Sequence, residues 1–187
     1  VLLRAGSDGE MLAGLESEGG LPPEFSVDFP LSGHFLGKAG DYLMAGDAHN
    51  VMSVNGVDFA VSPRSFFQVN LAQAGRMVEH ILANAVIKAD DTVLDLYSGV
   101  GLFSAFLAPR VKELAAVESS ESACNDFAVN LDKYDNVSLY IGTAEQILPG
   151  LEVKPDLVLV DPPRAGLAKG VVEYLIKSSA RELAYVS

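Results

Sequence analysis

Glycines and acidic residues recur in this chain at positions where a nucleotide-like ligand could be held. Residues 95–101 read Asp-Leu-Tyr-Ser-Gly-Val-Gly after an apolar run, and Glu118 follows Gly99 by 19 residues. Glycines let a backbone approach a ligand closely, and an acidic residue about 20 residues further on binds ribose hydroxyls in nucleotide-binding sheets. Ser104 replaces the third glycine of the dinucleotide fingerprint. Asp95, the turn and Glu118 therefore favour S-adenosylmethionine over NAD, although a tight turn and a solvated strand end would also explain them.

A second motif, Asp-Pro-Pro-Arg, occupies residues 161–164 directly after the apolar run 157–160. The prolines restrict the backbone, so the strand delivers the Asp161 carboxylate rigidly at its carboxyl end. In an open α/β sheet this end lies beside the first strand, where ligands bind. One proline would suffice to stop a strand. We therefore predict a catalytic and cofactor-contacting role for Asp161, and the fork of donors on Arg164 suits a phosphate.

Alternating strands and helices must position these two motifs. Helical spacing of apolar residues begins at Leu71 and extends to about Ile87, and strand, turn and helix then repeat to the end of the chain. The predicted strands are residues 92–97, 113–118, 137–141, 157–160 and 183–186, and the predicted helices are residues 102–107, 121–131 and 171–178. This alternation predicts an α/β fold, a parallel sheet with helices on both faces, as in Rossmann-like domains.

The first 62 residues have a different pattern. They are rich in glycine and contain short strand-like runs at residues 1–5, 11–15, 42–45, 51–54 and 57–61. Asn55-Gly56 between the last two runs is a strong hairpin signal. We predict a small antiparallel β region at residues 1–62 and a cofactor-binding α/β domain at residues 63–187.

Composition excludes several classes of function. With 13 Lys and Arg against 25 Asp and Glu, the net charge of −12 is wrong for a module that holds nucleic acid by charge alone. A single cysteine, Cys124, excludes a disulfide framework and suggests a cytoplasmic protein. Its helical neighbours are small, which favours an inert packing role. His34, His49 and His80 are too scattered for a metal site and are expected on the surface or in loops, and no apolar run could span a membrane.

Taken together, the motifs resemble the RNA uracil-5-methyltransferases, which make 5-methyluridine in tRNA or rRNA. Residues 62–70 read Ser-Pro-Arg-Ser-Phe-Phe-Gln-Val-Asn, and this run combined with residues 161–164 is the discriminating pair. The resemblance covers residues 60–187 and, more loosely, the β region, which is similar to part of that family's central domain. It implies a class I methyltransferase sheet that uses S-adenosylmethionine, truncated here after the fifth strand.

The resemblance also implies roles for individual residues. It places Asp161 between the cofactor and the target base, and Thr143 where the family often has Asp or Asn near the adenine. Phe66 and Phe67 favour packing over base stacking. Arg64 and Arg164 flank the two motifs and could meet phosphate, and for Arg164 we predict a contact with RNA. The full set of predicted cofactor contacts is Gln68, Asp95, Tyr97, Gly99, Gly101, Leu102, Glu118, Thr143 and Asp161.

In the mechanism that the resemblance implies, a cysteine thiolate adds to carbon 6 of uracil, carbon 5 takes the methyl group, and a glutamate base removes the proton from carbon 5. The target base must be unstacked, so loops or flipped bases are the expected substrates. The family continues Tyr-Val-Ser with Cys-Asn-Pro, and this chain has Tyr-Val-Ser at residues 185–187. We therefore expect the nucleophile and the base to lie outside these residues and the 187-residue piece alone to be inactive.

Two alternatives stay open at this stage. The chain could be a cofactor-binding module without catalysis, or a methyltransferase that acts on cytosine or an exocyclic amine. Arg164 and the Phe-Phe-Gln-Val-Asn run argue against the second alternative. The sequence leaves open whether tRNA or rRNA is the substrate, and what the oligomeric state is.

Overall fold

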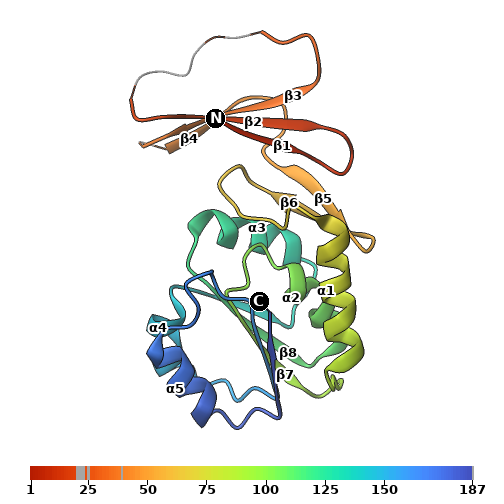
Figure 1. The fold of residues 1–187 in the computed structure, drawn as a ribbon, viewed down its shortest axis with the longest axis vertical. Helices are drawn as coiled ribbons and strands as arrows, with labels where there is room; N and C mark the ends of the chain where they lie inside the picture. The colour runs from red at the N-terminus through yellow and green to blue at the C-terminus, as the bar shows by residue number, and fades with distance from the viewer. Residues whose placement is uncertain (20–23, 25, 39, 187) are drawn as a thin grey trace.

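The computed structural model describes residues 1–19, 24, 26–38 and 40–186. Figure 1 shows a small sheet at one end of the molecule, a larger sheet with its helices at the other end, and a hairpin between them. The hairpin consists of β5 (Asn50–Val54) and β6 (Val57–Val61). The predicted boundary after residue 62 follows β6 closely, and the independence of the two regions stays a prediction.

The larger sheet contains five strands, all parallel, in the order β11-β10-β7-β8-β9. Their bounds are β7 (Thr92–Leu96), β8 (Glu113–Glu118), β9 (Val137–Ile141), β10 (Leu157–Val160) and β11 (Glu182–Tyr185). β10 lies beside β7, with Val160 opposite Leu96. The predicted α/β class, with the strand that precedes Asp161 next to the strand that precedes the glycine turn, is confirmed.

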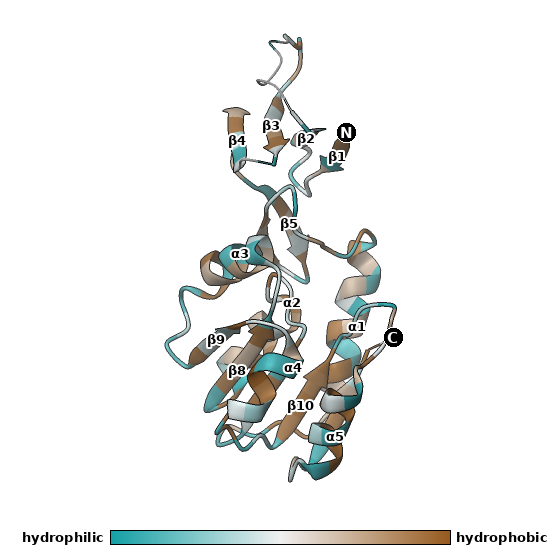
Figure 2. Cartoon of the chain, turned by 90° about the vertical axis from the view of Figure 1, so that its left-hand side faces the viewer, coloured by the Kyte–Doolittle hydropathy of each residue, from teal (hydrophilic) through white to brown (hydrophobic). Residues whose placement is uncertain are grey.

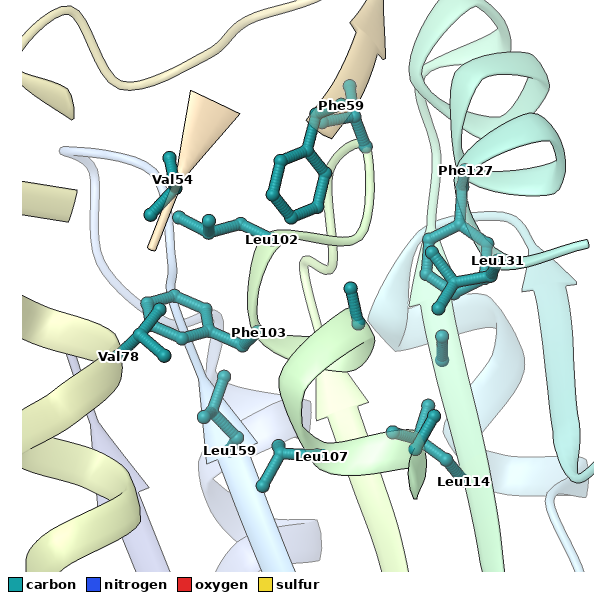
Figure 3. Packing of buried hydrophobic residues seen from close by; sticks show 14 of the residues in the cluster. Val54, Phe59, Val78, Leu102, Phe103, Leu107, Leu114, Phe127, Leu131 and Leu159 are labelled. Atoms are coloured by element: carbon teal, nitrogen blue, oxygen red, sulfur yellow. The ribbon is translucent and has the colours of Figure 1, made fainter. Parts of the chain in front are cut away.

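Helices cover both faces of this sheet. Successive residues of β10 point to opposite cores: Leu157 and Leu159 face one cluster, and Val158 and Val160 face the other. The first cluster, part of which is drawn in Figure 3, includes α1 (Leu71–Asn84), α2 (Leu102–Leu107) and α3 (Glu121–Leu131). The second includes α4 (Ala144–Ile147) and α5 (Lys169–Lys177), and short 3-10 turns occupy Ala108–Arg110 and Leu148–Gly150. Figure 2 shows β10 as uniformly hydrophobic, as a strand buried on both faces requires.

The small sheet has the order β1-β2-β3-β4. Its strands are β1 (Leu2–Ala5), β2 (Met11–Ser17), β3 (Leu31–Gly37) and β4 (Gly40–Ala45). The β1–β2 and β3–β4 pairs are antiparallel, as predicted for this region, whereas β2 and β3 pair in parallel. We did not predict β3, because Ser32, Gly33 and His34 interrupt any apolar alternation.

The hairpin confirms the Asn-Gly signal. Asn55 has φ 47° and Gly56 has φ 80°, so both central residues are left-handed, as a type I′ turn requires. The Asn55 side chain also donates to the carbonyl of Gly75 in α1 at 3.0 Å. The turn therefore fixes the hairpin against the large α/β unit as well as joining its own strands.

Several element bounds differ from those predicted. α1 ends at Asn84 and not near Ile87, because contacts with β11 hold the next residues extended: Val86 donates to the Glu182 carboxylate at 2.9 Å and accepts from Arg181 at 2.7 Å. The short helix α4 was not predicted. Among the described residues, no helix is both long and apolar enough to cross a bilayer.

Candidate functional site

The glycine turn between β7 and α2 has an unusual backbone. Tyr97, Gly99 and Gly101 have φ of 63°, 56° and 93°, so three residues in a run of five are left-handed. A Cβ at Gly101 would lie 2.3 Å from Leu131 Cδ2, whereas a Cβ at Gly99 would meet nothing within 4 Å. Gly101 therefore permits close packing of the turn on α3, and Gly99 borders open space.

Glu118, at the end of β8, contacts the glycine turn directly. Its Oε2 accepts from the Gly99 backbone N–H at 2.9 Å, and its Oε1 accepts from the N–H groups of Ser119 and Ser120, both at 2.7 Å. These bonds orient the carboxylate and leave one lone-pair site free, on Oε2. The juxtaposition that the 19-residue spacing predicted is therefore confirmed, and the Gly99 N–H is engaged by a carboxylate.

Asp95 lies beneath the turn, at 0% exposure. Its Oδ2 accepts from the Ser104 hydroxyl of α2 at 2.6 Å, while its Oδ1 has no hydrogen-bond partner among the described residues. Burial, reinforced by the charges of Asp161 and Glu118, raises the pKa of Asp95 to about 7. From the sequence, we noted Ser104 only because it occupies the place of the third glycine of the dinucleotide fingerprint. A serine in the otherwise apolar helix Leu102–Leu107 is the signal that could have identified it.

Asp161 follows β10 at the same edge of the sheet. Its backbone N–H donates to the Leu96 carbonyl at 3.3 Å, which extends the pairing of β10 with β7. The side chain is half-buried, and this burial raises its pKa. Asp95, Glu118 and Asp161 thus converge around one turn, as predicted, and make the site strongly acidic.

Other predicted contacts lie at the border of this turn. Tyr97 is half-buried, and burial followed by the nearby Glu145 carboxylate raises its pKa. Thr143 caps α4, and Gly142 before it donates to the Glu118 carbonyl at 2.8 Å. Leu102 turns its side chain into the core beside Val54 and Phe59 (Figure 3), so only its backbone is free for a ligand.

Phe66 and Phe67 lie in different environments. Phe67 is 7% exposed and packs on Phe59 at 5.5 Å between ring centroids, as the packing interpretation predicted. Phe66 is 72% exposed. Gln68 follows, half-buried. The packing prediction is therefore right for Phe67 and wrong for Phe66.

The two flanking arginines differ. Arg64 forms a fork with Asp41, with Nε to Oδ2 at 2.7 Å and Nη2 to Oδ1 at 2.9 Å, so a phosphate would have to displace a carboxylate there. Arg164 is exposed and has no hydrogen-bond or ion-pair partner among the described residues. The geometry therefore favours Arg164 over Arg64 as a contact for an anionic ligand.

Of the three histidines, His80 is exposed and His49 lies in a loop, both as predicted, whereas His34 does not fit the prediction. His34 lies on β3 at 5% exposure and pairs with the Asp47 carbonyl at 3.0 Å, which corrects the expectation of a surface or loop position. His49 Nε2 lies 3.4 Å from the buried Asp126 carboxylate. Within the described part of the chain, no group of three potential ligand side chains could hold a metal ion.

Cys124 is buried in α3. Its side chain is 3% exposed, and burial, with the charge of Glu118 as the next cause, raises its pKa to about 11. A nucleophilic cysteine requires an accessible thiolate, which this environment disfavours. The prediction of an inert packing role agrees with this position.

A cavity of about 1360 Å³ does not coincide with the predicted site. It lies between the small sheet and the first turn of α3, and its lining includes His34, His49, Arg64 and Ser120. None of the three converging carboxylates lines it. We place the functional site at the glycine turn, because positive-φ backbone, buried acids and open space coincide there.

The parallel five-stranded sheet and the acidic glycine turn at its carboxyl edge define a Rossmann-like methyltransferase domain. Comparison with known proteins shows which family within this class the chain belongs to. The sequence pattern of the tRNA (uracil-5-)-methyltransferase family matches residues 46–187. The chain belongs to this family.

Known relatives agree with this assignment. An uncharacterized RNA methyltransferase of Lactobacillus johnsonii is 34% identical over 81% of this chain, and one of Clostridium tetani is 38% identical over 69% of it. The chain spans about a third of the length of these relatives (35% and 29%). The crystal structure of the Pyrococcus abyssi tRNA (uracil-54, C5)-methyltransferase with S-adenosyl-L-homocysteine superposes with a TM-score of 0.78 at 27% identity, covering 98% of this chain and 48% of that one.

Proposed function

We propose that this chain binds S-adenosylmethionine at the glycine turn, across the carboxyl ends of β7, β8 and β10. The observation that carries the proposal is the convergence of Asp95, Glu118 and Asp161 there. Three carboxylates repel the pyrophosphate of a dinucleotide and attract a ligand that carries a sulfonium and an ammonium group. The Gly99 N–H, which a phosphate would need, is already bound to Glu118.

The residues of the site have separate tasks in this proposal. Glu118 accepts a ribose hydroxyl on the Oε2 lone pair that its backbone contacts leave free, and the absence of a Cβ at Gly99 lets the ligand approach the backbone there. Gln68 and Tyr97 border the methionine end, and Thr143 borders the adenine. Asp161 faces the target base from a rigid Pro-Pro segment. When bound, the cofactor supplies the methyl group.

We further propose that the whole protein methylates carbon 5 of a uridine in RNA. Support comes from the family and from three exposed groups in the two motifs of residues 62–70 and 161–164, namely Phe66, Val69 and Arg164, which are suited to stack on, pack against and bind the charge of an unstacked nucleotide. β11 also runs parallel to β10, and Val186 donates to the Val160 carbonyl at 2.9 Å. Val186, which follows β11, therefore lies beside the end of β10, the strand that precedes Asp161. Ser187 itself is outside the described residues.

Glu118→Ala is expected to weaken binding of S-adenosylhomocysteine by about 1 to 3 kcal/mol. This range covers the loss of a hydrogen bond to a charged group and the cost of the backbone donors that are left unpaired when the carboxylate is removed. Isothermal titration calorimetry measures this directly. Glu113→Ala is the matched control, because Glu113 is the exposed first residue of the same strand, at the opposite edge of the sheet. Equal affinities for wild type and Glu118→Ala would rule out the ribose assignment.

RNA specificity can be tested with the whole protein. We expect incubation with unmodified tRNA or rRNA and tritiated S-adenosylmethionine to place label in 5-methyluridine, identified by nucleoside chromatography. Cys124→Ser is expected to leave the rate unchanged, because the buried thiol cannot reach a substrate. Label in 5-methylcytidine or an N-methyl base would contradict the proposed specificity, and loss of label in Cys124→Ser would make Cys124 the nucleophile.

A further inference from the structure

One face of α3 carries a row of polar side chains that is turned toward the protein and not toward solvent. Ser122, Asp126 and Asn130 are spaced four residues apart, so they lie on the same side of the helix. Asp126 is fully buried, and Ser122 and Asn130 are half-buried. Buried polar groups are costly unless they are hydrogen-bonded. Their hydrogen-bond partners lie in two segments, residues 60–65 and the glycine turn, and His49 Nε2 lies 3.4 Å from Asp126 Oδ1 as well.

Asn130 joins these two segments. Its Oδ1 accepts from the Ala60 N–H at 2.8 Å, and its Nδ2 donates to the Ala60 carbonyl at 3.1 Å, so one amide satisfies both outward-facing backbone groups of an edge residue of β6. The same Nδ2 donates to the Val100 carbonyl at 3.0 Å. Val100 lies between Gly99 and Gly101. A single side chain therefore ties β6 to the glycine turn.

Asp126 holds the next outward-facing residue of the same edge. Its Oδ2 accepts from the Ser62 N–H at 2.8 Å, and its Oδ1 accepts from the Ser62 hydroxyl. From the other side, the Arg4 guanidinium of β1 donates to the Ser62 carbonyl at 2.9 Å and to the Ser65 carbonyl at 2.7 Å. Ser62 is thus fixed at its N–H, its hydroxyl and its carbonyl, and opposite charges compensate each other across the segment.

Ser122 completes the row. Its hydroxyl lies 2.7 Å from the Ser65 hydroxyl. The chain leaves this contact toward Phe67, which is anchored on Phe59, and then reaches Gln68. The contacts of α3 with Ala60, Ser62 and Ser65 therefore fix the point from which the chain runs on to Gln68. Gln68 has no hydrogen-bond partner of its own among the described residues, so its position depends on this anchoring.

We propose that Asn130 and Asp126 are positioning residues for cofactor binding: they hold residues 60–65 and the glycine turn as one unit, so that Gln68 and Gly99 approach the same ligand. This inference rests on the proposed function, because the ligand is the cofactor assigned there. The proposal adds that α3 and Arg4 of the small sheet set the geometry of the site without being assigned a contact with the ligand. The small sheet is then part of the cofactor site's support.

The test uses the absence of tryptophan from the chain. Phe66→Trp puts a single tryptophan, which can be excited selectively over the six tyrosines, at an exposed position beside the held segment. In this background, Asn130→Ala is expected to weaken S-adenosylhomocysteine binding about tenfold, as the loss of a buried hydrogen-bond partner implies, and to lower the fluorescence anisotropy of Trp at position 66. Asn125→Ala, on the exposed side of the same helix, is the matched control and is expected to change neither.

Thermal stability is measured for each variant, so that unfolding is not mistaken for loss of positioning. If Asn130→Ala does not fold, Ser65→Ala removes only the hydroxyl pair and is expected to give the same two changes to a smaller extent. Lower stability with wild-type affinity and anisotropy in the folded protein would overturn the proposal. If the Phe66→Trp parent and wild type both fail to bind S-adenosylhomocysteine, the cofactor assignment has failed, and the anisotropy still reports whether Asn130 holds the segment.

Discussion

Gly101→Ala is expected to lower the free energy of unfolding by about 2 to 5 kcal/mol. A left-handed backbone costs a non-glycine residue roughly 1 to 2 kcal/mol, and Gly101 has φ 93°. The added methyl would lie 2.3 Å from Leu131 Cδ2 and 3.1 Å from Phe127 Cδ2, both in the close-packed core of Figure 3, and overpacking there costs about 1 to 3 kcal/mol more. Urea denaturation of the purified chain measures the sum.

Gly99→Ala is the matched substitution two residues earlier. Gly99 is also left-handed, at φ 56°, but a Cβ there meets no atom within 4 Å. We expect about 1 to 2 kcal/mol of destabilisation from the backbone alone and a clear loss of S-adenosylhomocysteine affinity, because the new methyl occupies the space assigned to the ligand. Equal destabilisation by the two substitutions would show that the contact with Leu131 does not limit the packing of the turn.

These two glycines also show which features of the site the sequence predicts and which it does not. The motif and its spacing predicted that the glycine turn after β7 and the Glu118 carboxylate meet, because strand-turn-helix order dictates which edge of a parallel sheet they share. The sequence could not distinguish the two glycines. Their difference arises from Leu131 and Phe127, which approach Gly101 from another element.

The errors have a similar origin. β3 was missed because its buried residues include Ser32 and His34, whose polar atoms are satisfied by the loop around Asp47, a tertiary contact that no periodicity reveals. α1 was predicted too long because propensity continues past Asn84 while Arg181 and Glu182 hold Val86 extended. In both cases long-range hydrogen bonds override the local pattern.

The row on α3 carried a signal that was not used. Ser122, Asp126 and Asn130 each precede an apolar residue of the core stripe, namely Ala123, Phe127 and Leu131. Polar residues with helical spacing beside an apolar stripe indicate a face that is buried against hydrogen-bonding groups and not against a hydrocarbon core. Their partners, in residues 60–65 and Val100, were identifiable only from the structure.

Asp95→Asn is expected to stabilise the chain at neutral pH, although Asp95 belongs to the proposed site. The pKa of Asp95 is raised to about 7, above the ordinary value of 3.8 that applies to the unfolded chain. Between these two values the folded state keeps a proton that the unfolded state has lost, so the free energy of unfolding falls as pH rises from about 4 to 7 and then levels off. A shift of about three pKa units corresponds to about 4 kcal/mol.

The measurement is the difference in unfolding free energy between Asp95→Asn and wild type, by urea denaturation from pH 4 to pH 8. This difference is expected to grow by about 4 kcal/mol over that range, since asparagine keeps an acceptor for Ser104 and cannot ionise. Taking a difference cancels the opposite contribution of Asp91, whose pKa its hydrogen bond with Arg181 lowers. Asp161→Asn, at a half-buried acid whose pKa is raised in the same direction, is expected to give a smaller change.

A difference that stays constant with pH would show that Asp95 is ionised throughout, and that the Ser104 hydrogen bond outweighs burial. The expected result has a further consequence for the site. A buried acid with an unpartnered oxygen costs stability above pH 7, and asparagine would remove that cost while keeping the shape of the side chain. Its retention beside Glu118 and Asp161 is then explained by the negative charge it adds beneath a cationic ligand. Asp95→Asn is accordingly expected to weaken the binding of S-adenosylmethionine, which carries the sulfonium charge, at pH 8 while raising the midpoint of unfolding, whereas a merely structural acid would change the stability and leave the affinity unchanged.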